Sequence, residues 1–170
     1  LEAVRPGDTT ADLDRVAESF IRDQGAIPSF LGYRGTFPAT ICASIDDEIV
    51  HGIPSSARPL EEGQLLSLDF GAIWEGFHAD SAVITTQTIA VGPVKTTEEA
   101  LFAGIAAAQP GGRLSDIGAA IESVASSAGL GIVREYGGHG IGRSMHEDPF
   151  IQNFGRPGRG PELRPGLVIA

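Results

Sequence analysis

An internal repeat is the feature that most restricts how this chain can fold. Five residues near its start recur 104 positions later in the same order: Pro6, Gly7, Asp12, Glu18 and Gly25 return as Pro110, Gly111, Asp116, Glu122 and Gly129. A second block, Leu60–Gly63, resembles Leu163–Gly166 at a spacing of 103. Two helices with similar caps would explain the first match alone, but both matches together favour a duplicated α/β half. Two such halves would place a site at their interface, where pockets are often found.

Apolar spacing predicts the elements of each half. Residues at helical spacing follow a cap at Thr9 or Thr10, and this helix ends at Gly25. A second helix is predicted from about 115 to 128, and a third from a Thr97 cap to just before Pro110. Apolar runs predict strands over 39–45, 64–73, 78–89 and 131–136, and the last residues, 167–170, also have strand character. The sequence therefore predicts an α/β fold with an antiparallel sheet and flanking helices.

Composition narrows the class of protein. The 170 residues are 42% hydrophobic and 20% charged, which is typical of one globular domain. A net charge of −10 argues against direct binding of nucleic acid. No apolar run approaches the roughly 18 residues of a membrane span. The single cysteine, Cys42, excludes an internal disulfide and fits a reducing compartment. Because the chain begins at Leu1 and stops within an apolar run, we expect a domain truncated at both ends.

Two carboxylates stand in otherwise apolar strands. Asp69 and Asp80 flank a turn signal at Glu75-Gly76. A hairpin folded near Trp74-Glu75 would place the two aspartates opposite each other on one face, and a shift of one residue would make them diagonal neighbours. Carboxylates this close repel unless a proton or a cation lies between them. A solvated hairpin face is the alternative, but facing oxygen ligands suit a divalent metal.

The histidines favour a functional site. His139 and His146 lie seven residues apart in a glycine-rich segment, which we interpret as a loop. A phosphate-binding loop is disfavoured because no Lys-Ser/Thr pair follows the glycines. His51 lies between a predicted strand and a turn, and means little by itself. His78 is interpreted as structural and, by parity, as one strand face away from Asp80.

Three ordered blocks resemble the type I methionine aminopeptidases. They are Cys42–Pro54, Leu68–Asp80 and Gly138–Pro149, and the similarity covers nearly all 170 residues. The resemblance implies the pita-bread fold, in which two pseudo-symmetric α/β halves surround a metal site. That implication agrees with the repeat.

The resemblance also implies a role for each residue of the site. Asp69 would chelate one metal, Asp80 would bridge two, and His139 would bind the other. Two divalent ions (Co, Mn, Fe or Zn) are the expected cofactors, and two further glutamate ligands are expected beyond Ala170, so residues 1–170 alone are expected to be inactive. His146 would hydrogen-bond the substrate carbonyl, and His51 would contact the scissile amide nitrogen. Cys42, Tyr33, Phe37 and Met145 would line the methionine pocket.

Two positions depart from the family pattern, and two alternatives stay open. Met145 stands where many relatives have an aromatic residue, and Phe30 where some have a second pocket cysteine. The implied activity is removal of the initiator methionine from nascent proteins with a small second residue, by a cytoplasmic monomer, with the ribosome as a further partner. Neither direct nucleic-acid binding nor membrane attachment is expected. A prolidase or aminopeptidase P relative, or a non-catalytic binding module of the same fold, are the alternatives.

Overall fold

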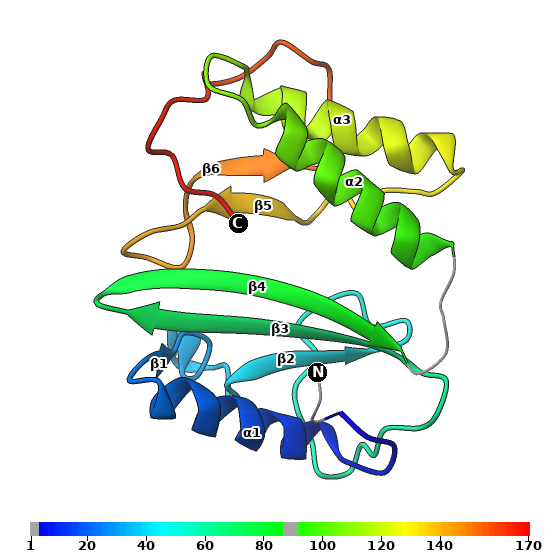
Figure 1. The fold of residues 1–170 in the computed structure, drawn as a ribbon, viewed down its shortest axis with the longest axis vertical. Helices are drawn as coiled ribbons and strands as arrows, with labels where there is room; N and C mark the ends of the chain where they lie inside the picture. The colour runs from blue at the N-terminus through cyan, green and yellow to red at the C-terminus, as the bar shows by residue number, and fades with distance from the viewer. Residues whose placement is uncertain (1–3, 87–91) are drawn as a thin grey trace. The chain divides into compact units, whose positions relative to one another are not determined.

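The computed structural model describes residues 4–86 and 92–170 (Figure 1). They form two compact units. Unit 1 comprises Leu1–Ile89 together with Gly142–Met145, and unit 2 comprises Ala90–Ile141 together with His146–Ala170. Residues 87–89 of the predicted strand 78–89 lie outside the described residues.

Unit 1 is a sheet covered by a helix. Its helix α1 spans Thr10–Asp23, and a 3₁₀ turn, η1, spans Tyr33–Gly35. Its strands are β1 (Ile27–Pro28), β2 (Ile41–Ile45), β3 (Leu65–Trp74) and β4 (Phe77–Thr86). The long strand β3 pairs antiparallel with β4 on one side, and with β2 and β1 on the other. The predicted antiparallel sheet is therefore confirmed.

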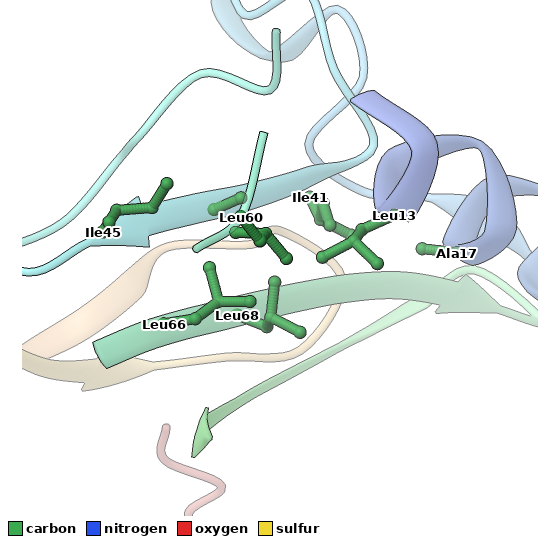
Figure 2. Packing of buried hydrophobic residues seen from close by; sticks show 8 residues of the cluster. Leu13, Ala17, Ile41, Ile45, Leu60, Leu66 and Leu68 are labelled. Carbon is green, nitrogen blue, oxygen red and sulfur yellow. The ribbon is translucent and has the colours of Figure 1, made fainter. Parts of the chain in front are cut away.

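The core of unit 1 lies on one face of this sheet. Leu66 and Leu68 of β3 are buried, whereas the residues between and beside them are half-buried. Figure 2 shows these side chains packed with residues of α1, β2 and the segment before β3. Since side chains alternate along a strand, the opposite face of β3 carries Ser67, Asp69 and Gly71. The core thus leaves the Asp69 face available for chemistry.

Unit 2 pairs two helices with a short hairpin. Helix α2 spans Pro93–Ala107, α3 spans Leu114–Ser127, and the antiparallel strands β5 and β6 span Gly137–Gly140 and Glu147–Gln152. Gly104 of α2 allows a close approach, because a Cβ there would lie 3.0 Å from the Ile121 side chain of α3. Among the described residues, no helix is both long and apolar enough to cross a membrane.

The predicted repeat reappears as matching local contacts inside each unit. Gly7 N–H donates to the Leu60 carbonyl at 2.8 Å in unit 1, and Gly111 N–H donates to the Leu163 carbonyl at 2.8 Å in unit 2. The first turn of α1 and that of α3 each contain an aspartate that accepts a hydrogen bond from the backbone N–H three residues earlier, Asp12 from Thr9 and Asp116 from Arg113. Two residues after the end of each of these helices lies a glycine with positive φ, Gly25 and Gly129. The duplicated half predicted from the sequence is thereby supported at the level of individual hydrogen bonds.

Two predicted elements were wrong. Residues 131–136 form no strand, and the segment 137–140, interpreted as a loop, is β5. The Thr97 cap was also misplaced: α2 begins at Pro93, and the Thr97 hydroxyl donates to the Pro93 carbonyl at 2.8 Å within the helix. Proline suits this first position because its missing N–H would have no partner there.

Candidate metal centre

Asp69 and Asp80 lie together on the non-core face of the β3–β4 hairpin. The turn is Glu75-Gly76, both with positive φ, and Trp74 pairs with Phe77. In this register Gly71 faces Asp80 and Asp69 faces Ala82, so the aspartates are diagonal neighbours rather than directly opposite. Of the two registers left open by the sequence, the structure has the one shifted by one residue.

The two carboxyl groups interact strongly. Burial, the charge of Asp80 and a hydrogen bond with its carboxyl group raise the pKa of Asp69 to about 7. Oδ1 of Asp69 is buried and has no hydrogen-bond partner among the described residues. A buried carboxylate oxygen without a partner is costly, and a cation between the two groups would remove both the repulsion and the unmet acceptor. The aspartate pair therefore fits a divalent metal.

The described residues contain no group of three or more His, Cys, Asp or Glu side chains placed to hold a metal. Asp69 and Asp80 belong to unit 1, and His139 belongs to unit 2. The structure thus brings the two aspartates together, and it also brings His139 to His146.

We expect the metal-free protein to lose stability as pH rises from about 4 to about 7. Folded Asp69 holds its proton up to about pH 7, whereas an unfolded aspartate releases it near 3.8. The folded state therefore binds more protons in this window, and its stability falls with increasing pH. For this partly exposed group we expect a loss of about 1–2 kcal/mol.

Thermal unfolding in a chelator at pH 5 and pH 8 measures the effect, with Asp69→Asn to isolate it. Three other carboxyl groups act on stability in the opposite direction, because their pKa values are lowered in the folded state. They are Glu48, through hydrogen bonds first from the Ile45 N–H and then from Arg58, together with Asp12 and Asp116. Their stabilisation is present above their ordinary pKa values and is lost only as pH falls through their lowered ones. Equal pH dependence in the wild type and Asp69→Asn would contradict the expectation.

His139 and His146 form a pair within unit 2. Their ring centroids are 4.2 Å apart and the ring planes meet at 38°. Nδ1 of His139 lies 2.9 Å from the Gly140 carbonyl oxygen. A carbonyl oxygen only accepts hydrogen bonds, so this contact requires the proton on Nδ1 and gives Nε2 the lone pair that binds a metal. His146 is exposed.

Residues Gly142–Met145, which lie between these histidines in the sequence, belong to unit 1. The His78 N–H donates to the Gly142 carbonyl at 2.7 Å, and the Arg143 guanidinium lies 4.5 Å from the centre of the Phe77 ring. Met145 is buried. Gly142–Met145 is thus held by the β3–β4 hairpin and by the cluster described next, although the residues on either side of it belong to unit 2.

The predicted pocket residues gather in one apolar cluster of unit 1. Phe30, Cys42 and Met145 are buried, and Tyr33 and Phe37 pack against them. The Phe30 and Phe37 rings meet edge to face, with centroids 6.4 Å apart. Burial, followed by the charges of Asp69 and Asp80, raises the pKa of the Cys42 thiol to about 12, so this side chain is a neutral apolar wall rather than a nucleophile. Cys42 faces Asp69 across β2 and β3.

His51 and His78 are placed differently. His51 is exposed, in a loop after β2, with φ of +61°. His78 is partly buried, and its Nδ1 lies 3.0 Å from the Ser29 hydroxyl. Its predicted face was wrong: residues two apart in a strand share a face, so His78 lies on the same side of β4 as Asp80.

Sequence reasoning missed three contributors to these arrangements. Ser44 and Gly52 hold the loop next to His51. Arg143 stacks on Phe77. The His-Gly pair at 51–52 was a signal that the backbone approaches another segment closely, but a serine within a strand has no recognisable pattern.

Comparison with known proteins gives a consistent result. The sequence model of metallopeptidase family M24 matches residues 1–170. Methionine aminopeptidase from Clostridium acetobutylicum is 51% identical over 177 residues, covering 99% of this chain and 69% of that protein. Methionine aminopeptidase 1 from Mycobacterium tuberculosis is 50% identical over 182 residues, covering 99% and 66%. The chain therefore spans about two thirds of the length of these curated relatives.

Solved structures agree with the fold. The crystal structure of methionine aminopeptidase from Rickettsia prowazekii matches with a TM-score of 0.94 and 38% identity, over 99% of this chain and 68% of that one. The mixed α/β arrangement with antiparallel sheets is thus the pita-bread fold of these enzymes. Prolidase from Pyrococcus furiosus matches with a TM-score of 0.82 but only 21% identity, which shows a shared fold alone.

Proposed function

The chain belongs to metallopeptidase family M24, among its methionine aminopeptidases, and we propose that it carries out metal-dependent removal of an N-terminal methionine. The observation that carries the proposal is the Asp69–Asp80 pair. The raised pKa of Asp69 beside Asp80 and the unpartnered, buried Oδ1 of Asp69 fit a cation, and the pair lies one strand away from the apolar cluster around Cys42.

We propose Asp69, Asp80 and His139 as metal ligands. The aspartates supply oxygens from one sheet face, and the Gly140 carbonyl orients His139 so that Nε2 is the ligating atom. When bound, two divalent ions lower the pKa of a water molecule and polarise the scissile carbonyl. The number and identity of the ions are part of the proposal, since these ligand types accept Co, Mn, Fe or Zn.

The histidines act on the substrate. His146, next to His139, would donate a hydrogen bond to the carbonyl oxygen as negative charge develops there. His51 would contact the amide nitrogen and assist departure of the new amine. The cluster of Cys42, Tyr33, Phe37 and Met145 would receive the methionine side chain. The substrates would be the N-termini of newly made proteins, encountered in the cytoplasm and near ribosomes, by a protein that acts as a monomer.

Substrate selectivity tests this proposal. We expect Met-Ala-Ser to be cleaved at least tenfold more efficiently than Leu-Ala-Ser or Lys-Ala-Ser. A narrow, apolar cluster accommodates an unbranched thioether side chain, whereas it offers no partner for the ammonium group of lysine. The assay measures kcat/KM with added manganese or cobalt, on a polypeptide of the relatives' length that includes residues 1–170.

Two results would contradict parts of the proposal. Equal cleavage of the three peptides would remove the methionine preference and leave a general metalloaminopeptidase. Hydrolysis of Xaa-Pro dipeptides in place of Met-Ala-Ser would favour the prolidase alternative, whereas no metal-dependent hydrolysis of either class would favour a binding module.

A further inference from the structure

His51 has an unusual backbone for a histidine. Its φ of +61° lies in the left-handed region, which side chains other than glycine rarely adopt. Such a conformation persists only when the surrounding structure imposes it, and it is common at functional sites. The contacts of the neighbouring residues show what imposes it here.

Gly52 joins the loop to the free edge of β2. The Ala43 N–H donates to the Gly52 carbonyl at 2.8 Å. A Cβ at position 52 would lie 2.3 Å from the Ala43 carbonyl oxygen and 2.8 Å from Ser44 Cα. Only glycine allows this approach, so the peptide that follows His51 is pressed against the strand.

Ser44 provides the second attachment. This residue is buried, at 4% exposure, and its hydroxyl oxygen accepts the Gly52 N–H at 3.1 Å. Ser44 faces Ser67 across the sheet, and Cys42 faces Asp69. Because alternate residues share a face, the Ser44 hydroxyl points to the side of the sheet that carries Asp69.

The rest of the loop is fixed at both ends. Glu48 accepts the Ile45 N–H at 2.9 Å and pairs with Arg58. Ser55 N–H donates to the hydroxyl of the fully buried Thr10 at 2.9 Å. The loop is therefore braced before and after His51, and the contacts at Gly52 hold the peptide that follows His51.

We propose that Ser44 is a positioning residue for His51: its hydroxyl holds the Gly52 N–H and thereby keeps His51 in the left-handed conformation from which its imidazole would reach the substrate amide. The inference rests on the role proposed for His51. Without the hydroxyl, the buried Gly52 N–H loses its partner, and the peptide can rotate so that His51 returns to a common negative φ. The imidazole then points away from the substrate amide while the metal ligands stay in place.

Ser44→Ala tests the inference, with Ser67→Ala as the matched control. Ser67 is the cross-strand partner of Ser44 on the same face, so the control makes the same chemical change one strand away. For Ser44→Ala we expect kcat on Met-Ala-Ser to fall at least tenfold with KM and metal stoichiometry unchanged, and hydrogen exchange of the Gly52 amide to accelerate at least tenfold. Ser67→Ala should leave all four quantities near wild type.

The design separates failure of the inference from failure of the proposed function. Ser44→Cys keeps a side chain of similar size with a weaker acceptor, and should show a smaller change of the same kind if Ser44→Ala folds poorly. The inference would be overturned if hydrogen exchange of the Gly52 amide were unchanged in both Ser44→Ala and Ser44→Cys. It would also be overturned if Ser44→Ala kept full kcat while His51→Ala lost it. Full kcat in His51→Ala would instead overturn the proposed role of His51, and the catalytic part of the inference with it.

Discussion

Asp69→Asn is expected to abolish metal-dependent peptidase activity and, at the same time, to stabilise the metal-free protein. Both effects have one cause. The carboxyl group of Asp69 is partly buried beside Asp80, and its pKa is raised to about 7 because the charged form is unfavourable there. An amide has no charge to bury or repel, so at pH 8 the free energy of unfolding of the metal-free protein should rise by about 1–2 kcal/mol.

The loss of function follows from the same substitution. An amide is a poor ligand for a divalent ion compared with a carboxylate, so the substituted side chain would no longer help to hold the metal that would lower the pKa of the attacking water. We expect at least a thousandfold decrease in kcat/KM and the loss of a metal equivalent, measured by titration calorimetry and elemental analysis. In the wild type below about pH 7, tight metal binding should displace the proton held by Asp69, so proton release accompanies binding.

Asp23→Asn is the matched control, because it makes the same change at an exposed position near the end of α1. It should alter neither metal binding nor stability measurably. An Asp69→Asn protein that is less stable without metal than the wild type would show that the carboxylate has a structural partner. Retained metal stoichiometry would remove Asp69 from the ligand set.

The fold was predictable to the extent that it depends on local signals. The repeat located both capped helices, and the structure shows the same glycine, aspartate and leucine contacts in each unit. The turn was recognised from the Glu75-Gly76 pair, because glycine readily adopts the positive φ that a tight hairpin requires, and both residues have positive φ in the structure. The final register was left open, since the two choices differ only in which residue closes the turn.

The errors in the predicted strands arose where a strand forms through close backbone contact and its side chains show no strand pattern. Residues 137–140 contain three glycines, a composition that favours a loop over a strand. Yet a Cβ at Gly137 would lie 2.2 Å from the Ile151 carbonyl oxygen, and one at Gly140 2.2 Å from that of Asp148. Here glycine is required for the two strands to approach, and only the partner strand reveals this.

The contacts that anchor the loops of the site could not be predicted from the sequence either. Arg143 on Phe77 and Ser44 on Gly52 join residues far apart in the sequence, and neither pair forms a motif. The candidate ligands were found because chemistry limits which residue types bind metals. The residues that anchor the loop after β2 and the segment Gly142–Met145 were missed because many residue types can form such contacts.

His146→Ala is expected to lower kcat on Met-Ala-Ser by about a hundredfold to a thousandfold, while metal stoichiometry stays at the wild-type value. His146 lies 4.2 Å from His139, ring centre to ring centre, and directly follows the buried Met145. In the proposed role, His146 would donate to the substrate oxygen, and this hydrogen bond would be strongest in the transition state, where negative charge grows on that oxygen. KM should therefore change much less than kcat.

His139→Ala is the informative comparison, because the two histidines are neighbours and the substitution is identical. That variant should lose metal as well as activity, since the Gly140 carbonyl fixes the His139 tautomer that exposes a ligating Nε2. His146→Gln retains a hydrogen-bond donor and should recover part of the lost kcat if oxygen stabilisation is its role. Loss of a metal equivalent in His146→Ala would make His146 a ligand. An unchanged kcat would exclude His146 from the reaction, because its proposed hydrogen bond to the substrate oxygen acts on the rate alone.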